Sequence, residues 1–326
     1  MIDRYGRTID YMRISVTDRC NLRCVYCVPE CGVTRIPTER LLTEEELLRI
    51  MRAAAKEGIA HVKVTGGEPL LRPNLAWLVQ KIREIPGIET VTLTTNGFLL
   101  PDQIDGLTAA GISGINISLD TLNKERYRSL TRGGELERAL AGLEAAKRQK
   151  GVTVKVNAVL YETHWEEDAL TLAALAEKDP VHVRFIEHMP LGTEAEERPV
   201  REEAILALLQ KEYGKCESYQ GKIGEGPGHY VTFPGMTGKI GFISAISHKF
   251  CSECNRIRLT SQGYLKTCLQ YTAGRDLREA LRNGGTDEEL KEIIKAALSE
   301  KPDGHHFREK VKADDTESLC MSQIGG

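Results

Sequence analysis

The amino-acid sequence predicts an α/β protein built as a partial (β/α)6 TIM-like barrel with a C-terminal extension. Two observations lead to this fold class. First, apolar strand-like runs alternate six times with amphipathic helical patterns, which is typical of a parallel sheet. Second, almost every run ends in polar or glycine-rich residues. Functional groups in parallel α/β proteins collect at the carboxyl ends of strands, so six such ends in succession favour a barrel ring over an open sheet.

The predicted elements follow one another in a regular order. Strands are expected at residues 12–16, 61–65, 91–94, 114–118, 152–159 and 181–186, and helices at 43–57, 75–85, 101–110, 136–150 and 168–177. The first helix has the clearest signals, because Thr43 and Glu46 form a capping box and Gly58 ends the apolar periodicity.

The sequence changes character after about residue 199. Residues 201–213 are predicted to form a helix, but the glycine-rich segment 221–241 ends the alternation of strand and helix. Residues 256–264 are predicted to form a hairpin, and the last 40 residues are charged and helical. We therefore expect two regions, a partial barrel over residues 1–220 and a C-terminal region over residues 221–326.

The composition excludes some classes of function. With 326 residues and a net charge of −3, the chain lacks the basic field that a nucleic-acid-binding protein needs. The N-terminus shows no signal peptide, and no apolar run approaches the ~20 residues of a membrane span. A cytoplasmic protein without membrane contact is expected, and its nine cysteines would then be reduced thiols available for metal.

Two sets of three cysteines indicate metal chemistry. Cys20, Cys24 and Cys27 form C-x3-C-x2-C directly after the first strand, and three thiolates can hold three irons of a [4Fe–4S] cluster while the fourth stays open. Cys31 extends this loop to four cysteines, which a closed zinc site would also explain. The second set is Cys251, Cys254 and Cys268. Two three-cysteine sets favour two [4Fe–4S] clusters over two zinc sites.

The first cysteine loop resembles the signature loop of radical S-adenosylmethionine (SAM) enzymes, including the aromatic Tyr26 before the last cysteine. Residues 66–69, Gly-Gly-Glu-Pro, resemble the glycine-rich motif of that superfamily, in which glycines let a backbone approach a ligand closely. The resemblance implies that the open iron binds SAM, which is cleaved to a 5′-deoxyadenosyl radical. It also implies that SAM contacts the following residues: Tyr26, Gly67, Ser118 and Met189.

Further motifs resemble the GTP 3′,8-cyclase family over the whole chain. They are RISVTDRCN at 13–21, VTGGEPL at 64–70, LTTNG at 93–97, NISLD at 116–120, VKVN at 154–157, RFIE at 184–187, CSECNRIRL at 251–259 and the terminal pair Gly325-Gly326. The resemblance implies the first step of molybdenum cofactor biosynthesis. The radical removes the ribose 3′ hydrogen of GTP, C3′ attacks guanine C8, and an electron and a proton complete (8S)-3′,8-cyclo-7,8-dihydroguanosine 5′-triphosphate.

The expected substrate explains a group of basic residues. A nucleoside triphosphate carries about four negative charges, each worth ~4 kcal/mol with a cation 4 Å away at an effective dielectric constant of 20. Arg256 and Arg258, two apart on a strand, would share one face. By resemblance, GTP contacts Arg13, Lys63, Thr94, Lys155, Arg184, Arg256, Ile257 and Arg258, the second cluster binds guanine, and the catalytic residues are Arg256, Arg258, Gly325 and Gly326.

Departures from the family and rival interpretations remain. Val28 replaces a usual methionine, Lys63 replaces a usual arginine and so loses the bidentate fork, and Cys31 is an additional thiol. A radical SAM peptide maturase is one alternative, although the single three-cysteine set followed by Arg-x-Arg disfavours it. A zinc- or cluster-stabilised scaffold without catalysis is another. The resemblance also implies a homodimer, an electron donor and a downstream pterin-forming synthase as partners.

Overall fold

The computed structural model describes residues 1–191, 200–307, 317 and 319–325. Six strands come from the first part of the chain: β1 (Tyr11–Ser15), β2 (His61–Thr65), β3 (Thr90–Thr95), β4 (Gly114–Ser118), β5 (Thr153–Ala158) and β6 (Val181–Ile186). Six more follow: β7 (Glu217–Ser218), β8 (His229–Thr232), β9 (Ile240–Ile243), β10 (Arg256–Leu259), β11 (Tyr264–Lys266) and β12 (Gly274–Asp276).

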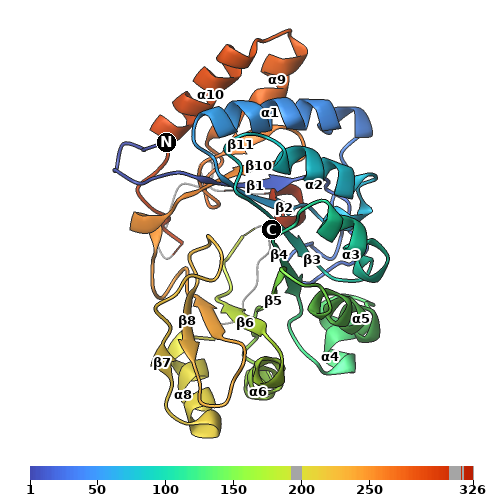
Figure 1. The fold of residues 1–326 in the computed structure, drawn as a ribbon, viewed down its shortest axis with the longest axis vertical. Helices are drawn as coiled ribbons and strands as arrows, with labels where there is room; N and C mark the ends of the chain where they lie inside the picture. The colour runs from blue at the N-terminus through green and yellow to red at the C-terminus, as the bar shows by residue number, and fades with distance from the viewer. Residues whose placement is uncertain (192–199, 308–316, 318, 326) are drawn as a thin grey trace.

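All of these strands belong to one sheet, in the order β12-β11-β10-β1-β2-β3-β4-β5-β6-β9-β8-β7. The stretch from β10 through β1–β6 to β9 is parallel, and the two outer strands at each edge are antiparallel. The sheet curves around the centre of the molecule (Figure 1). The predicted partial barrel is therefore confirmed, and one parallel strand from the C-terminal region extends each of its sides.

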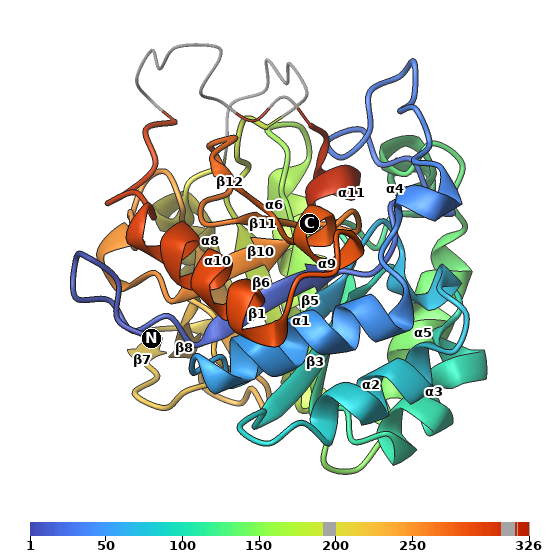
Figure 2. The same cartoon turned by 90° about the horizontal axis from the view of Figure 1, so that it is seen from above.

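Helices cover the outer face of the curved sheet. In chain order the α-helices are α1 (Glu44–Lys56), α2 (Leu75–Arg83), α3 (Leu100–Ala109), α4 (Lys124–Leu130), α5 (Leu136–Lys147), α6 (Trp165–Ala173), α7 (Leu175–Lys178), α8 (Glu202–Tyr213), α9 (Leu277–Arg282), α10 (Asp287–Ser299) and α11 (Met321–Ile324). The short 3-10 helices are η1 (Thr38–Arg40), η2 (Pro69–Leu71) and η3 (Cys251–Glu253). Figure 2 shows α1, α2, α3 and α5 arranged along the outside of β1–β4.

Local sequence signals explain where the best-defined helix starts and stops. Thr43 and Glu46 form the predicted capping box of α1, with both reciprocal hydrogen bonds present. Gly58 follows the helix with a φ of +96°, a conformation that costs glycine nothing. The helix buries Leu47, Ile50 and Met51 completely against the sheet. Burying side chains of this size contributes about 2 kcal/mol each, which fixes α1 on the outside of the barrel.

The structure corrects the sequence prediction at several elements. The helix predicted at 168–177 starts earlier and is divided into α6 and α7. The segment 221–241, predicted to end the alternation of strand and helix, contains β8 and the start of β9. Among the described residues, the last 40 are helical only in α10 and α11.

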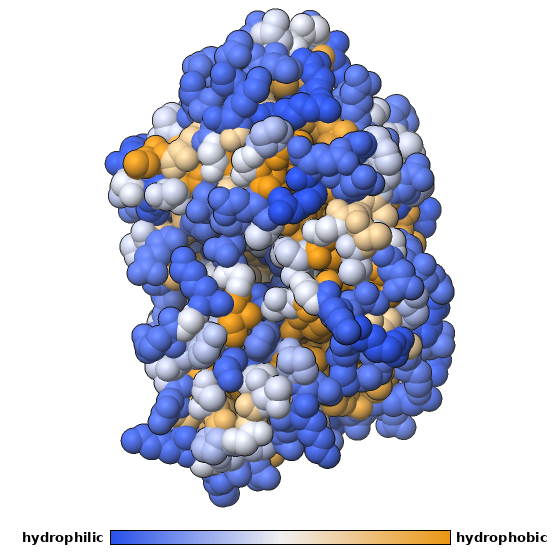
Figure 3. All heavy atoms as spheres, in the orientation of Figure 1, coloured by the Kyte–Doolittle hydropathy of each residue, from blue (hydrophilic) through white to orange (hydrophobic). Residues whose placement is uncertain are grey.

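The described helices include none that is long and apolar enough to cross a membrane. The face of the molecule shown in Figure 3 is mostly hydrophilic.

Candidate active site

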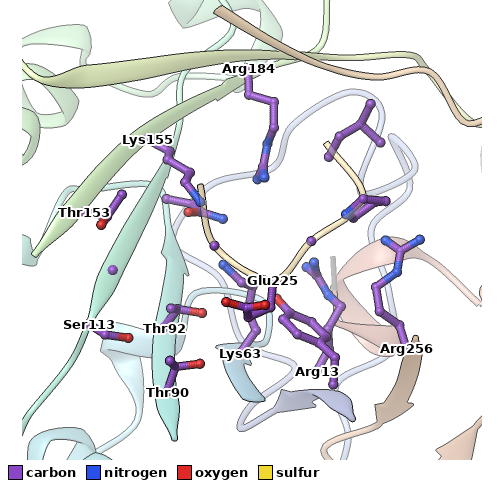
Figure 4. A pocket seen from close by; sticks show the side chains of 17 residues that line it. Arg13, Lys63, Thr90, Thr92, Ser113, Thr153, Lys155, Arg184, Glu225 and Arg256 are labelled. Atoms are coloured by element: carbon purple, nitrogen blue, oxygen red, sulfur yellow. The ribbon is translucent and has the colours of Figure 1, made fainter. Parts of the chain in front are cut away.

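A basic pocket lies inside the barrel. Its cavity has a volume of about 190 Å³. Arg13, Lys63, Lys155, Arg184 and Arg256 line it, and Figure 4 shows their side chains directed toward a common space. The segment 224–227 crosses the same space. Five of the eight GTP-contacting residues implied by the resemblance are thus brought together in one cavity.

The pleat and the register of the strands place these cations. β1, β2, β5, β6 and β10 each contribute one cationic side chain to the pocket, and successive residues of a strand point to opposite faces. Arg13 pairs in register with Lys63 on one side and with Arg258 on the other. Asn116 pairs with Lys155, and Asn157 pairs with Arg184. The inward positions of neighbouring strands therefore form a continuous polar lining.

The hydrogen bonds of the pocket orient the cations without neutralising them. Lys155 donates to the backbone oxygen of Ile223 at 2.6 Å, and Arg184 donates to Asn157 Oδ1 at 2.7 and 3.0 Å. In the amide orientation that satisfies its neighbours, Asn116 Oδ1 accepts from Lys63 Nζ at 2.7 Å and from Arg184 at 3.1 Å. These partners are neutral oxygens, so the pocket keeps a net positive charge.

Burial and mutual repulsion shift the pKa values of these cations. Desolvation, reinforced by Arg184, lowers the pKa of Lys155 to about 7. The same two causes place the pKa of Lys63 well below its usual value, with Arg13 and Lys155 adding to the repulsion. Among the pocket residues that the structure describes, Glu225 is the one carboxylate. A site with this excess of buried cations favours a polyanionic ligand.

Two further residues expected to contact GTP have different surroundings. Thr94 Oγ1 is buried and has no hydrogen-bond partner among the described residues, which leaves it available to a ligand. Ile257 is fully buried in the apolar core. Its side chain therefore packs in the core and does not line the pocket, and a role in binding would fall to its backbone.

The first cysteine set lies on the loop after β1. Cys27 N and Val28 N both donate to Cys24 O, at 2.9 and 3.0 Å, and Leu22 N lies 3.4 Å from Cys20 Sγ. Burial raises the pKa of Cys20 to about 11 and that of Cys27 to about 12. Burial also raises the pKa of Cys24, and Asp120, Cys27 and Cys20 raise it further. Cys31 is exposed, outside this group.

Three thiols on one short loop suit an iron–sulfur cluster, whose irons would stabilise the thiolates that the protein alone does not. Within the described part of the chain, no three Cys, His, Asp or Glu side chains are arranged around a single metal ion. The spacing and the donor type of Cys20, Cys24 and Cys27 fit a cluster with one open iron.

The glycine-rich motif packs directly on the cysteine loop. Gly67 N donates to Thr17 O and Glu68 N donates to Arg19 O, each at 2.7 Å. A Cβ on Gly67 would overlap the carbonyl oxygen of Arg19, so this position requires glycine. The motif therefore has a structural role, to fit against the loop, in addition to the SAM contact that the sequence predicts.

The other residues expected at SAM surround the same end of the barrel. Tyr26 Oη donates to Asp120 Oδ2 at 3.1 Å, which fixes the ring beside the end of β4. Ser118 is the last residue of β4, and Met189 follows β6 and is half-buried. With Gly67 after β2, these positions gather at the carboxyl ends of the strands, where barrel enzymes carry their chemistry.

The second cysteine set has a different electrostatic environment. Cys251 and Cys254 lie at and just after η3, and Cys268 follows β11. Burial alone would raise the pKa of Cys254, but the cations of Arg256 and Lys301 lower it to about 7. Arg256 Nη2 lies 3.9 Å from Cys254 Sγ, and Lys301 Nζ lies 3.7 Å from it. These three cysteines also fit a cluster with one open iron, close to the basic pocket.

The C-terminal tail reaches into the barrel. Ser322, in α11, lies beside the thiol of Cys27, so the tail passes the first cysteine loop. Arg258 Nη1 then donates to Gly325 O at 2.6 Å. A Cβ on Gly325 would lie 2.8 Å from Thr65 Oγ1, so the passage admits only a residue without a side chain. Gly326 lies outside the described residues.

Comparisons with known proteins show the class and the family to which the chain belongs. The Radical SAM superfamily model matches residues 14–176, and the Molybdenum Cofactor Synthesis C model matches residues 181–307. The structure of Streptococcus suis SuiB has a TM-score of 0.62 over 97% of this chain and 78% of its own, at 16% identity, which shows a common fold. The barrel and its cysteine loop define a radical SAM protein.

Relatives that match the full length of this chain show which family of radical SAM proteins it belongs to. The GTP 3′,8-cyclase of Clostridium perfringens (strain SM101 / Type A) is 44% identical over 326 residues, covering 100% of both chains. The GTP 3′,8-cyclase of Pelotomaculum thermopropionicum is 42% identical over 329 residues, with the same coverage. The chain belongs to the GTP 3′,8-cyclase family.

Proposed function

We propose that this chain is a radical SAM GTP 3′,8-cyclase that converts GTP to (8S)-3′,8-cyclo-7,8-dihydroguanosine 5′-triphosphate, the first step of molybdenum cofactor biosynthesis. One observation carries the proposal: a pocket lined by five buried or half-buried cations adjoins the second three-cysteine set. Family membership supplies the reaction, and the pocket supplies a place for its polyanionic substrate.

The pocket residues account for binding of the triphosphate. Arg184, Lys155 and Lys63 come from neighbouring sides of the barrel, and each cation near a phosphate oxygen contributes up to ~4 kcal/mol at an effective dielectric constant of 20. Arg13 lies between Lys63 and Arg258 in register and completes the cationic wall. Thr94 Oγ1, which has no hydrogen-bond partner among the described residues, would donate a hydrogen bond to an oxygen of the bound nucleotide.

The two cysteine sets and the C-terminal tail account for the remaining steps of the reaction. A cluster held by Cys20, Cys24 and Cys27 would supply the electron for reductive cleavage of SAM. Arg256 and Arg258 orient the purine beside the second set, because both side chains lie on the pocket side of β10. Gly325 narrows the barrel next to Arg258 and excludes water from the ribose. An external donor supplies the electrons, and a pterin-forming synthase consumes the product.

Anaerobic reconstitution of the full chain with iron and sulfide tests this function. With SAM, a strong reductant and GTP, we expect two cubane clusters per chain, GTP-dependent 5′-deoxyadenosine, and a product isomeric with GTP by mass spectrometry. Formation of 5′-deoxyadenosine with unchanged GTP would point instead to a peptide maturase or another nucleotide. Zinc in place of iron, with no 5′-deoxyadenosine, would support the non-catalytic scaffold and refute the proposal.

A further inference from the structure

A buried lysine joins the two segments that carry the second cysteine set. Lys301 follows α10 and is 2% exposed. Its ammonium donates to Thr267 O at 2.6 Å, directly before Cys268, and to Arg256 O at 2.8 Å, two residues after Cys254. It also lies 3.7 Å from Cys254 Sγ. The three donor positions of one ammonium are therefore directed at the segments that hold the three thiols.

The segment that begins at Lys301 is fixed from the other side. Arg7 is buried and ion-paired with Asp3 at 2.7 Å. Its guanidinium donates to Pro302 O at 2.6 Å, to Asp303 O at 2.9 Å and to Cys251 O at 2.8 Å. The backbone after Lys301 and the backbone of the first cysteine of the set thus share one buried cation. This arrangement prevents the ammonium from moving away from the thiols.

The two cysteine sets differ in the charges around them. The charged side chains that act most strongly on the first set are the carboxylates of Glu68 and Asp120. The corresponding charges at the second set are the cations of Arg256 and Lys301. A cluster gains negative charge on reduction, so nearby cations stabilise its reduced form and nearby carboxylates destabilise it.

We propose that Lys301 is a positioning residue of the second cluster, which holds the two cysteine segments together and raises the reduction potential of that cluster through its contact with Cys254 Sγ. The inference rests on the proposed function only in requiring that Cys251, Cys254 and Cys268 hold a [4Fe–4S] cluster. Lys301 lies outside every motif used to predict the site, and it acts through the thiolate without touching substrate.

The test is a redox titration of the reconstituted full chain, followed by electron paramagnetic resonance. Replacing Cys20, Cys24 and Cys27 by alanine assigns the remaining signal to the second cluster. Lys301→Gln keeps most of the side-chain length but removes the charge. We expect a lower midpoint potential for the second cluster and an unchanged potential for the first. Lys301→Arg should restore the second potential, and Lys295→Gln, which removes a charge from the exposed face of α10, should change neither.

Each outcome separates this inference from the function. A wild-type chain without a second cluster would refute the proposed function, whatever Lys301 does. A Lys301→Gln chain with full iron content and an unchanged second potential would overturn the inference alone. If Lys301→Gln loses the second cluster, the test passes to Lys301→Arg, which keeps the charge. A wild-type potential of the second cluster in Lys301→Arg supports the charge effect. A lower potential in that variant contradicts the charge effect. Thermal unfolding of each variant shows whether the fold is retained.

Discussion

At the scale of single residues, the basic pocket gathers five cations around Glu225, the one carboxylate among its described lining residues. Lys155 shows the consequence most directly, because its folded pKa of about 7 lies far below the ordinary lysine value of 10.5. Between these two values the unfolded chain binds the proton and the folded chain does not. The stability of the folded chain therefore rises with pH from about 7 to 10.5, and the charged lysine destabilises the folded chain fully below about pH 7.

The same shift predicts proton uptake on GTP binding. At pH 8 most Lys155 side chains are neutral in the free protein, and a bound triphosphate would raise the pKa and recharge them. We expect proton uptake at pH 8, and affinity that falls as the pH rises above 7. Titration calorimetry in two buffers of different ionisation enthalpy measures the uptake, which Lys155→Met should reduce by up to one proton. Equal uptake in both proteins would contradict this assignment.

Arg256 connects the second cysteine set to the pocket, which predicts a selective defect when its side chain is removed. Arg256→Ala should retain both clusters and lower cyclisation at least 100-fold, a loss of about 3 kcal/mol that is typical for one stabilising donor. Iron analysis and product mass spectrometry make the comparison. Arg275→Ala, at an exposed arginine of β12 paired with Glu300, serves as the control and should be silent. Near-normal turnover in Arg256→Ala would remove this residue from the catalytic set.

The sequence singled out the cations that line the basic pocket, but it missed a residue that lies outside every motif. Arg13, Lys63, Lys155 and Arg184 were predictable because each lies on a strand within a family motif, and strand pleating fixes where such side chains point. Lys301 was not predictable, since it lies 47 residues from Cys254 in a segment with no recognisable pattern. Only the folded chain brings it to the thiols.

At the scale of secondary-structure elements, regular βα units were predictable and the added strands were not. The bounds of β2, β4 and β6 agree with the sequence prediction, because apolar residues alternate with polar ones along each of them. The glycine-rich sequence of residues 221–241 did not indicate β8 or the start of β9, both of which lie within it. These strands are specified by pairing with β6 and with each other, which no local pattern reveals.

A buried ion pair fastens the C-terminal tail to the hairpin of β10 and β11. Lys266 and Glu317 are in contact and nearly inaccessible to solvent, and Glu317 N donates to Gln270 O at 2.6 Å. Breaking a buried pair by removing one partner costs about 3–5 kcal/mol. We expect Glu317→Gln to release the tail, so that amide hydrogen exchange in α11 accelerates and cyclisation falls, while both clusters remain.

The control for this prediction is Glu300→Gln, which breaks the exposed pair with Arg275 and should leave exchange in α11 unchanged. Unaltered exchange in Glu317→Gln would show that the tail is held by the contact between Arg258 and Gly325 instead.

At the scale of the whole molecule, the C-terminal region completes both sides of the barrel. β10 pairs with β1 and β9 pairs with β6, so the predicted boundary at residue 220 runs through a single hydrogen-bonded sheet. These two strands bury four large apolar side chains almost completely: Ile240, Phe242, Ile257 and Leu259. At about 2 kcal/mol each, their burial contributes roughly 8 kcal/mol, which is comparable to the stability of a typical domain.

A fragment of residues 1–220 should consequently fail to fold on its own. It would expose β1 and β6 as two unprotected edges and lose the packing of those four side chains. We expect aggregation on expression, with no cooperative thermal transition for any soluble part, whereas the full chain shows one. A soluble fragment that unfolds cooperatively would establish the first region as an independent domain.

The basic pocket and the first cysteine loop occupy opposite ends of the same strands. Thr90 and Thr153 begin β3 and β5 and line the pocket, whereas Gly67 and Ser118 mark the far ends of β2 and β4. SAM and GTP would therefore reach the centre of the barrel from opposite ends. Neither ligand would block the binding or the release of the other. Such a geometry gives random-order kinetics, in which methionine and 5′-deoxyadenosine can leave while the nucleotide stays in place.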